Sequence, residues 1–243
     1  MDIKEFLNEL EKTSDNSIAV VHVPSIKKDI EFGMFNVNQQ KQQLKTAFEG
    51  VVGVINSNIL YNEFLVDNCT EPVEFNIVDR PSIIINLRKL SLNDNITIQD
   101  KDYSLNELGN IDYSNFTETR AVTCDNIICN LGIPSLTTDT SICKRLVAEL
   151  NKLSDEQQKT ESVSLLLTYE IIKFVQSIKI GKTLLDFNDI SVYEKKNIVE
   201  KLPLKLNNNI LDYIVDIKTK CNEYLTFEDG TLLEIDASLL SSD

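Results

Sequence analysis

The sequence has little histidine and little glycine for its 243 residues. His22 is the one histidine, so a Ser-His-Asp or Cys-His mechanism would depend on a residue that lies in an apolar run between valines. The seven glycines form neither G-x-x-x-x-G-K-S/T nor G-x-G-x-x-G, the two common phosphate-binding patterns. These absences argue against nucleophilic catalysis and against nucleotide binding.

Positive charge is also scarce. The chain has 24 basic and 38 acidic residues, which gives a formal net charge of −14. A chain of this charge repels the phosphate backbone of nucleic acids. The short pairs Lys27-Lys28 and Lys195-Lys196 stand beside acids and have no aromatic residues between them. We therefore expect no nucleic-acid partner.

Long apolar runs are missing as well. No run approaches the roughly 20 residues that span a bilayer, so we expect no membrane insertion. The first residues, MDIKEFLNELEK, alternate acidic and apolar side chains, which is not typical of a signal peptide.

Five cysteines form an odd and widely spaced set, which favours reduced thiols in a cytosolic protein over a disulfide framework.

Cys124 and Cys129 form the only pair with a metal-like spacing, C-x4-C. A structural zinc site usually has two such pairs, and the second is missing here. The apolar surroundings of Cys124 and Cys143 favour buried thiols rather than activated thiolates. A metal-dependent or thiol enzyme that uses Cys124, Cys129 and His22 is thus the weaker hypothesis, and we expect no enzymatic activity, no cofactor and no metal.

The N-terminal part mixes helical and strand patterns. Gly50 and Gly53 fall inside one long helical stripe, where close packing against another backbone would explain them. The expected elements are a short helix over 2–12, a hairpin of strands at 18–23 and 28–35, a long helix over 38–59, a helix that Asp79 caps with Pro81 in its early turn, and strands at 96–98 and 120–133. We predict an α+β domain over residues 1–137.

Beyond about residue 138 the strand pattern gives way to helical stripes. The expected elements are helices over 141–153 and 163–178, a helix that begins with the capping box Ser191-Val192-Tyr193-Glu194, a helix through 210–221, and a hairpin with its turn at Asp229-Gly230. We place a domain boundary at residues 134–139. We predict that residues 138–243 form a mainly helical domain with a C-terminal hairpin.

Several segments resemble the T4-type baseplate hub subunit family of contractile-tailed phages. The segment Phe35-Asn36-Val37-Asn38-Gln39-Gln40-Lys41-Gln42-Gln43-Leu44-Lys45-Thr46-Ala47 fits the family pattern F-x-V-x-x-x-K-x-x-L-x-x-A, in which a strand leads into a helix. Asp79 to Ser91, with Leu87-Arg88-Lys89-Leu90-Ser91, Gly132-Ile133-Pro134-Ser135-Leu136 and Tyr169-Glu170-Ile171-Ile172 are similar to later parts of the family. The chain lacks the aromatic ending of some members.

The resemblance implies a structural component of the baseplate hub, located in the virion tail and in the host cytoplasm during assembly. Its partners would be other hub, tail tube or tape-measure proteins, and self-association is compatible with this role. The resemblance suggests Phe35, Leu87 and Arg88 as interface residues, and we expect the binding surface to be an apolar patch rimmed by acids. The alternative is a transient assembly chaperone that is absent from the finished particle.

Overall fold

The computed structural model describes residues 2–4 and 18–240, so most of the helix expected over 2–12 lies outside the described residues. The chain divides into two compact units. The first contains the chain up to Phe75, Asp79–Ile111 and the chain from Tyr224 onward, and the second contains Asn76–Val78 and Asp112–Glu223. The boundary expected at residues 134–139 falls inside the second unit, and separate folding of 1–137 and 138–243 stays a prediction.

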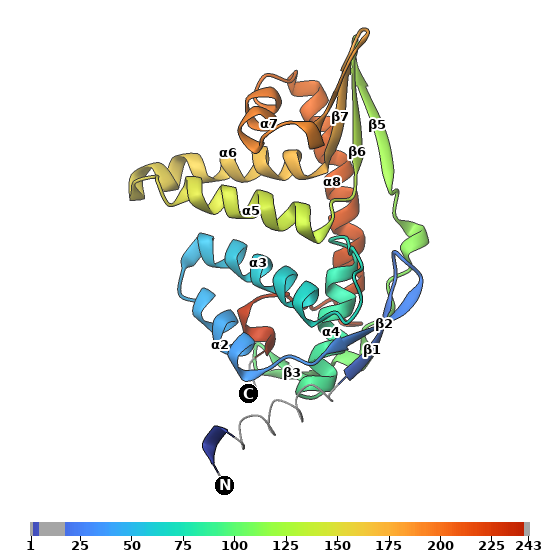
Figure 1. Ribbon diagram of the computed structural model, residues 1–243, viewed down its shortest axis with the longest axis vertical. Helices are drawn as coiled ribbons and strands as arrows, with labels where there is room; N and C mark the ends of the chain where they lie inside the picture. The colour runs from blue at the N-terminus through green and yellow to red at the C-terminus, as the bar shows by residue number, and fades with distance from the viewer. Residues whose placement is uncertain (1, 5–17, 241–243) are drawn as a thin grey trace. The chain divides into compact units, whose positions relative to one another are not determined.

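Both units combine helices with small antiparallel sheets, which confirms the α+β class (Figure 1). The expected N-terminal hairpin is confirmed in the first unit, where β1 pairs with β2 and alternate residues of β1 are buried. A second hairpin, β3–β4, turns through Gln99 and Asp100, both at positive φ as a two-residue type I′ turn requires. The elements of this unit are β1 (Ile18–Val23), β2 (Lys28–Gly33), α2 (Val37–Thr46), α3 (Gly50–Asn68), α4 (Asp79–Ser91), β3 (Asn95–Ile98), β4 (Lys101–Ser104), and the 3₁₀ turns η1 (Leu105–Glu107) and η4 (Ala237–Leu240).

The single long helix expected over 38–59 is wrong, because the chain breaks there into α2 and α3. Gly50 lies at the break with a φ of +60°, a conformation that glycine adopts without strain. The close packing expected at Gly53 is confirmed, since a Cβ there would overlap the carbonyl oxygen of Thr46. The apolar period of 3.6 residues continues across this corner, so periodicity alone did not reveal it.

The helix expected to start near Asp79 is confirmed as α4, with Pro81 in its first turn. Asp79 is itself buried. Its carboxylate accepts hydrogen bonds from the backbone N–H of Ser25 (2.9 Å) and from the Ser25 hydroxyl (2.6 Å). This carboxylate therefore holds the β1–β2 connection to the start of α4.

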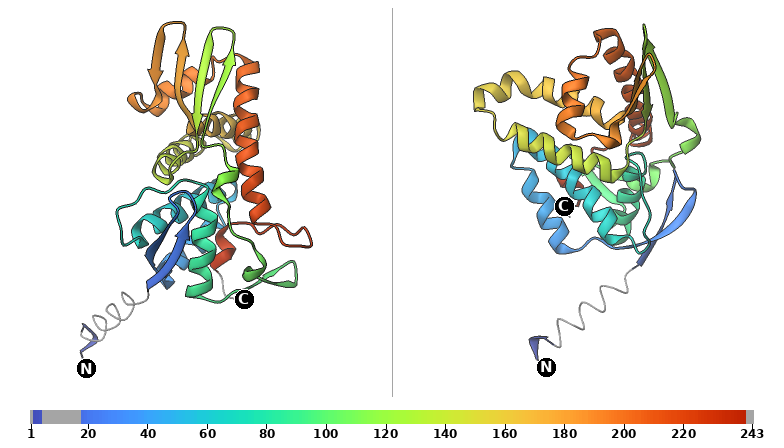
Figure 2. Two further views of the ribbon diagram at one scale, coloured as in Figure 1. Left: turned by 90° about the vertical axis from the view of Figure 1, so that its right-hand side faces the viewer. Right: turned by 45° about the horizontal axis from the view of Figure 1, so that its top comes forward.

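The second unit contains a four-stranded antiparallel sheet in the order β5-β6-β7-β8. Val122, Cys129 and Ile178 lie opposite one another on adjacent strands and form the buried face of this sheet. Helices α5, α6 and α7 lie on one side of it, and α5 and α6 run side by side (Figures 1 and 2). The elements are the 3₁₀ turn η2 (Tyr113–Asn115), β5 (Thr119–Cys124), β6 (Ile127–Gly132), α5 (Leu136–Leu150), α6 (Asp155–Phe174), β7 (Val175–Ile180), β8 (Thr183–Asp186), the 3₁₀ turn η3 (Phe187–Asp189), α7 (Val192–Val199) and α8 (Leu204–Tyr224).

The expectation that residues 138–243 contain no strands before a C-terminal hairpin is wrong, because β7 and β8 complete this sheet. The helix expected over 163–178 ends at Phe174, and Val175 already has extended backbone angles. Ile178 fits both a helical stripe and a buried strand position, so the apolar spacing did not indicate the transition from helix to strand. The alternation Ile178-Lys179-Ile180 and the positive φ of Gly181 mark the hairpin.

The predicted C-terminal hairpin is also wrong. Around the expected turn, Thr226 and Leu232 form one isolated antiparallel bridge, and no strand continues from it within the described chain. The chain instead runs into η4, whose Ala237, Leu239 and Leu240 are buried in the first unit. Burial of these three apolar side chains takes the place of strand pairing.

Candidate protein-binding surface

The three residues suggested as an interface lie mostly inside the first unit. Leu87 is 0% exposed and Arg88 is 2% exposed, while Phe35 is half-buried with its ring centroid 6.4 Å from those of Tyr61 and Phe64. Neither Leu87 nor Arg88 offers its side chain to a partner in this fold. These positions belong to the packing of the unit, and the binding surface has to be sought among exposed side chains.

Arg88 is bonded to backbone carbonyl groups. Its Nε donates to the carbonyl of Leu239 at 2.9 Å, and an NH group donates to the carbonyl of Asn93. Tyr61 donates to the carbonyl of Asp236 at 2.8 Å, and Gln40 donates to that of Leu240 at 2.6 Å. Side chains of α2, α3 and α4 thus hold the C-terminal segment, and loss of Arg88 would weaken the fold rather than remove a contact with a partner.

The residues considered for catalysis do not come together. His22 is exposed on β1, and its Nδ1 lies 2.8 Å from the carboxylate of Asp29 on the paired strand. All five cysteines are free thiols, and the expected burial of Cys124 and Cys143 is confirmed. Burial raises the pKa of the Cys129 thiol to about 12, which keeps it protonated at neutral pH. Such a thiol is a poor nucleophile.

Two further observations concern metals and membranes. In residues 2–4 and 18–240, no three side chains of His, Cys, Asp or Glu converge on a point where they could hold a metal ion. No helix in these ranges is both long and apolar enough to cross a bilayer.

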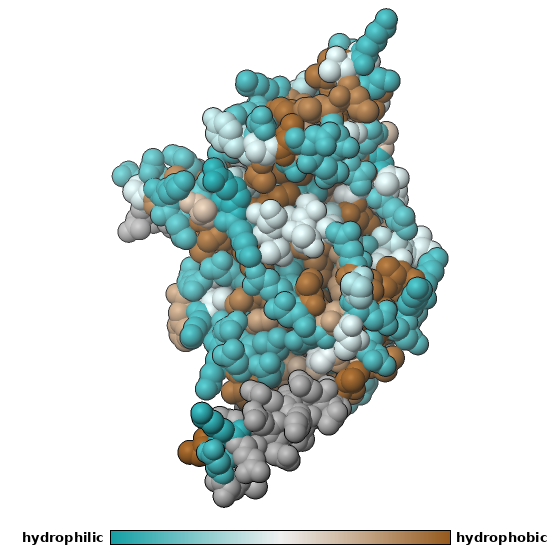
Figure 3. All heavy atoms as spheres, viewed as in Figure 1, coloured by the Kyte–Doolittle hydropathy of each residue, from teal (hydrophilic) through white to brown (hydrophobic). Residues whose placement is uncertain are grey.

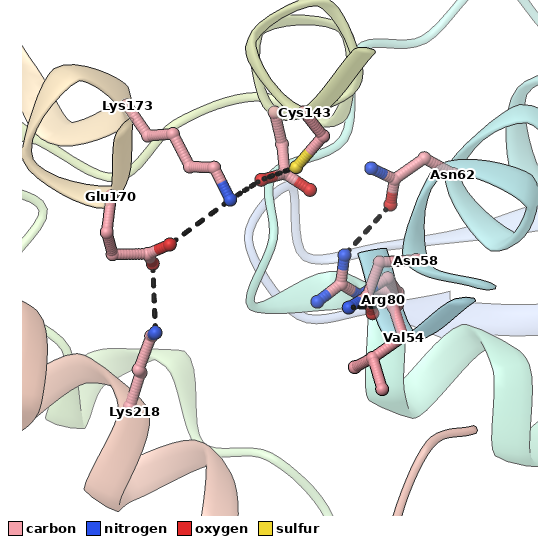
Figure 4. A network of polar contacts seen from close by, with 9 residues as sticks. Val54, Asn58, Asn62, Arg80, Cys143, Glu170, Lys173 and Lys218 are labelled. Carbon is pink, nitrogen blue, oxygen red and sulfur yellow. Dashed lines mark hydrogen bonds and ion pairs between the residues drawn. The ribbon is translucent and has the colours of Figure 1, made fainter. Parts of the chain in front are cut away.

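A buried charged cluster lies in the second unit (Figure 4). The ammonium group of Lys173 is 2.8 Å from the carboxylate of Asp139 and 3.2 Å from that of Glu170. Glu170 in turn lies 3.0 Å from the ammonium group of Lys218, and the Cys143 thiol lies 3.7 Å from Asp139. These side chains come from α5, α6 and α8, so the cluster joins three helices by opposite charges.

Electrostatics favour this cluster in its fully charged form. Burial opposes the charge on Lys173, but the carboxylates of Glu170 and Asp139 outweigh it and hold the lysine pKa above its usual value. Burial raises the pKa of the Cys143 thiol to about 11, although Lys173 acts in the opposite direction. A lysine that stays protonated and a thiol that stays neutral are unsuited to nucleophilic attack, and the cluster is best explained as a structural tie.

A groove of about 550 Å³ lies in the first unit between β3 and residues 231–238. Backbone and side chains of Ile96 to Gln99 form one wall. The ionisable residues that line it are Glu234 and Asp236, and its hydroxyl groups belong to Thr97, Thr231 and Ser238. The Ser238 hydroxyl donates to the Asp236 carboxylate at 2.6 Å, two residues away, and no Lys, Arg or His belongs to this lining.

Helix α2 has an unusual inner face, made of polar side chains. Gln39, Gln43 and Thr46 follow each other at helical spacing and are its buried residues. The Gln43 amide donates to the carbonyl of Ser57 at 3.0 Å and accepts from the Ser57 hydroxyl at 2.9 Å, while the Gln39 amide donates to the side chain of Asn68 at 2.9 Å. Hydrogen bonds from the Gln39 and Gln43 side-chain amides to α3 therefore hold α2 in position, in place of the apolar packing that holds most helices.

The outer side of α2 carries the apolar residues. Val37 is 64% exposed, Leu44 is 37% exposed, and Phe48, just beyond the helix, is 92% exposed. Their spacing of seven and four residues places them in one row, opposite the buried glutamines. Val51 and Val54, at 57% and 63% exposure, lie on the first turns of α3, after the corner that follows Phe48. We call Val37, Leu44, Phe48, Val51 and Val54 the outer face.

The corner between α2 and α3 fixes the outer face. The side chain of Asn36 caps α2 in a capping box with Gln39, so Val37 stands at a defined first position. Gly53 lets the start of α3 lie against the carbonyl of Thr46, which fixes the corner that follows Phe48. The apolar period in the sequence includes Leu44 and Phe48 and suggested that they point inward. The glutamines at positions 39 and 43 were the signal that could have corrected this.

Apolar residues are also exposed elsewhere, including Val163 and Leu167, four residues apart on α6, and Val215 on α8. On the face seen in Figure 3, hydrophilic side chains predominate and apolar ones reach the surface in separate areas. The outer face differs from these because α2 buries polar side chains and exposes its apolar ones.

Comparison with known proteins gives no match: no family model, no curated protein and no solved structure is similar to this chain.

Proposed function

We propose that the protein is a non-enzymatic building block of a contractile-tail baseplate hub, and that it acts by binding other tail proteins. The observation that supports this most is the outer face, where Phe48 is 92% exposed and Val37 is 64% exposed. Single exposed apolar residues are normal on proteins, but a helix that exposes its apolar side while it buries a polar one favours a binding surface. Nearly complete exposure of a phenylalanine costs about 1.5–3 kcal/mol that burial against a partner would recover.

The polar inner side of α2 strengthens the proposal. A helix selected only to fold would bury Leu44 and expose Gln43, because apolar burial stabilises more than a neutral hydrogen bond. In this chain Gln43 is 0% exposed and Leu44 is 37% exposed. The arrangement is reasonable if the apolar side becomes buried when a partner binds.

The family resemblance supports the tail assignment independently of the burial argument. The pattern that begins at Phe35 and ends at Ala47 covers the connection from β2 into α2, so the family-like segment and the outer face share one helix. The partners expected on this basis are hub, tail tube or tape-measure proteins. One feature differs from the sequence-based expectation: the charged residues beside this apolar surface are Lys41, Lys45 and Glu49, so it is not rimmed by acids alone.

The test is co-purification of the full chain with tail proteins, with Phe48→Ser beside Val215→Ser as a matched control. Val215 is an exposed valine on α8, 58% exposed and outside the outer face. We expect Phe48→Ser to lose the partners and Val215→Ser to retain them. Equal retention by both variants would contradict the role of the outer face, and turnover of a small molecule without any tail partner would contradict the function.

Mass spectrometry of purified tails then separates the two roles within this function. A structural hub component is present in the finished particle at a fixed ratio to its neighbours. A transient chaperone binds during assembly through the same surface but is absent from the particle.

A further inference from the structure

The charge around the outer face identifies the chemistry of its partner. The chain as a whole has a formal charge of −14, yet the segment that forms α2, VNQQKQQLKT, contains two lysines and no acid. Lys41 and Lys45 are both exposed, and Lys41 lies between Val37 and Leu44 on the same side of the helix. A basic helix surface on an acidic protein is thus combined with an apolar row.

We infer that the outer face binds an amphipathic helix of another protein, one whose apolar stripe is flanked by acidic residues. This inference rests on the proposed function and specifies the partner for that surface. Val37 to Thr46 form the 10 residues of α2, about 14 Å along a helix at 1.5 Å per residue, and Phe48 follows just beyond its end. A partner helix of three to four turns would cover this row with apolar residues at i, i+3 or i+4, and i+7.

The lysines add selectivity to apolar contact. Lys45 lies in the last turn of α2, where a basic residue also complements the helix dipole, so Lys45 alone would not indicate a partner. Lys41 lies in the middle of the helix and has no such role. A long lysine stem can cover apolar surface while its ammonium group reaches a carboxylate at the edge of the contact. Acidic partners would be attracted, and basic helices would be repelled.

The first experiment identifies the partner segment by its chemistry. A photoreactive phenylalanine analogue replaces Phe48 in the full chain, which is then irradiated in an extract of the cells that naturally produce it. The cross-linked peptide is sequenced by mass spectrometry. A segment of another protein with helical apolar spacing and an excess of Asp and Glu supports the inference.

Other cross-links overturn it. These are a basic or non-helical segment, a second copy of this chain, the chain's own residues 2–12, or no specific cross-link at all. The proposed function fails separately: it survives if Phe48→Ser loses its tail partners while the cross-linked segment is not acidic, and it fails if the unchanged chain co-purifies with no tail protein.

The second experiment tests charge through binding kinetics with the partner identified by cross-linking. We expect Lys41→Glu to slow association by about tenfold at low salt and the difference to shrink at high salt, because flanking charges act mainly on the association rate. Phe48→Ser should instead speed dissociation by more than about tenfold, as expected for a central contact. Lys205→Glu, an exposed lysine on α8, is the matched control. Equal effects of Lys41→Glu and Lys205→Glu would contradict an acidic partner.

Discussion

Helices α2 and α8 bury opposite kinds of side chain. Helix α8 buries apolar residues at helical spacing, among them Ile210, Tyr213 and Ile217, and exposes its polar ones. Helix α2 buries Gln39 and Gln43 and exposes its apolar ones. Both sequences are amphipathic, and the period alone shows that two faces exist. The difference teaches that the period alone does not determine which face the fold buries.

The largest effect is expected from α8, whose inner face supports the second unit. Tyr213 is 0% exposed, packs edge-on against Phe174 with ring centroids 6.0 Å apart, and donates hydrogen bonds to the carbonyls of Thr117 (2.7 Å) and Glu118 (3.1 Å). Tyr213→Ala should lower the free energy of unfolding by about 3–5 kcal/mol, because it leaves a cavity.

Chemical denaturation measures this change, with Tyr213→Phe as the control. The phenylalanine variant keeps the packing and removes the hydroxyl, so it should lose about 1 kcal/mol. Equal losses in the two variants would show that the hydrogen bonds, rather than apolar packing, hold α8 in place.

A smaller effect is expected from the amide contacts of α2. Gln43→Leu should cost about 1–3 kcal/mol, because the buried hydroxyl and carbonyl of Ser57 lose their partner. The double variant Gln43→Leu with Ser57→Ala should recover part of this loss, since it removes one of the two unpaired groups. Gln42→Leu, at the neighbouring half-exposed amide, serves as the control in denaturation experiments. A gain in stability from Gln43→Leu would show that the amide contacts are dispensable for holding α2.

Much of the fold follows from the sequence, and the failures have physical causes. The β1–β2 hairpin, α4, the strands within residues 120–133 and α8 were predictable because each has one clear period between turn residues. Periods that run across a corner misled the prediction at Gly50 and at Phe174, where helical spacing continues after the helix has ended. The C-terminal segment follows no period, because Arg88 and Tyr61 hold its backbone carbonyls from distant parts of the chain.

The candidate surface was less predictable than the fold. Leu87 and Arg88 were chosen from motif resemblance, but burial of a motif residue depends on contacts that a single sequence does not display. Phe48 lies in the helical stripe expected over 38–59, and apolar residues at such spacing usually pack inward. Only the buried hydrogen bonds from side-chain amides of α2 to α3 reveal that α2 buries its polar side and exposes its apolar side.

A still smaller effect is expected at the edge of the cluster that joins α8 to α6. Burial opposes ionisation of Glu170, but the charges of Lys173 and Lys218 outweigh it and hold the Glu170 pKa below its usual value. A lowered carboxyl pKa stabilises the fold at pH values above the ordinary glutamate pKa of about 4.3, and this stability is lost as the pH falls through the lowered pKa. Lys218→Met should raise that pKa, so acid unfolding should begin at a higher pH.

At neutral pH the Lys218→Met variant should lose less than about 1 kcal/mol, because the lysine side chain is 55% exposed and solvent screens the pair. Acid titration followed by circular dichroism measures both effects. Lys205→Met, at an exposed lysine of the same helix, should unfold in acid like the unchanged protein. An identical shift in both variants would mean that net charge, and not the Glu170 pair, determines the acid stability.

The smallest effect on stability is expected at Phe48, where the contrast between the two helices is sharpest. At 92% exposure its ring makes little contact with the fold, so Phe48→Ser should change the free energy of unfolding by no more than about 0.5 kcal/mol. The same substitution at an inner position of α8, Ile214→Ser, removes a side chain that is 2% exposed and should cost several times more. Urea denaturation of both variants compares the two positions directly. If Phe48→Ser destabilised the chain by as much as Ile214→Ser, the phenylalanine would be part of a core, and the outer face would not be available to a partner. If stability stays unchanged while tail partners are lost, Phe48 contributes to binding and not to folding.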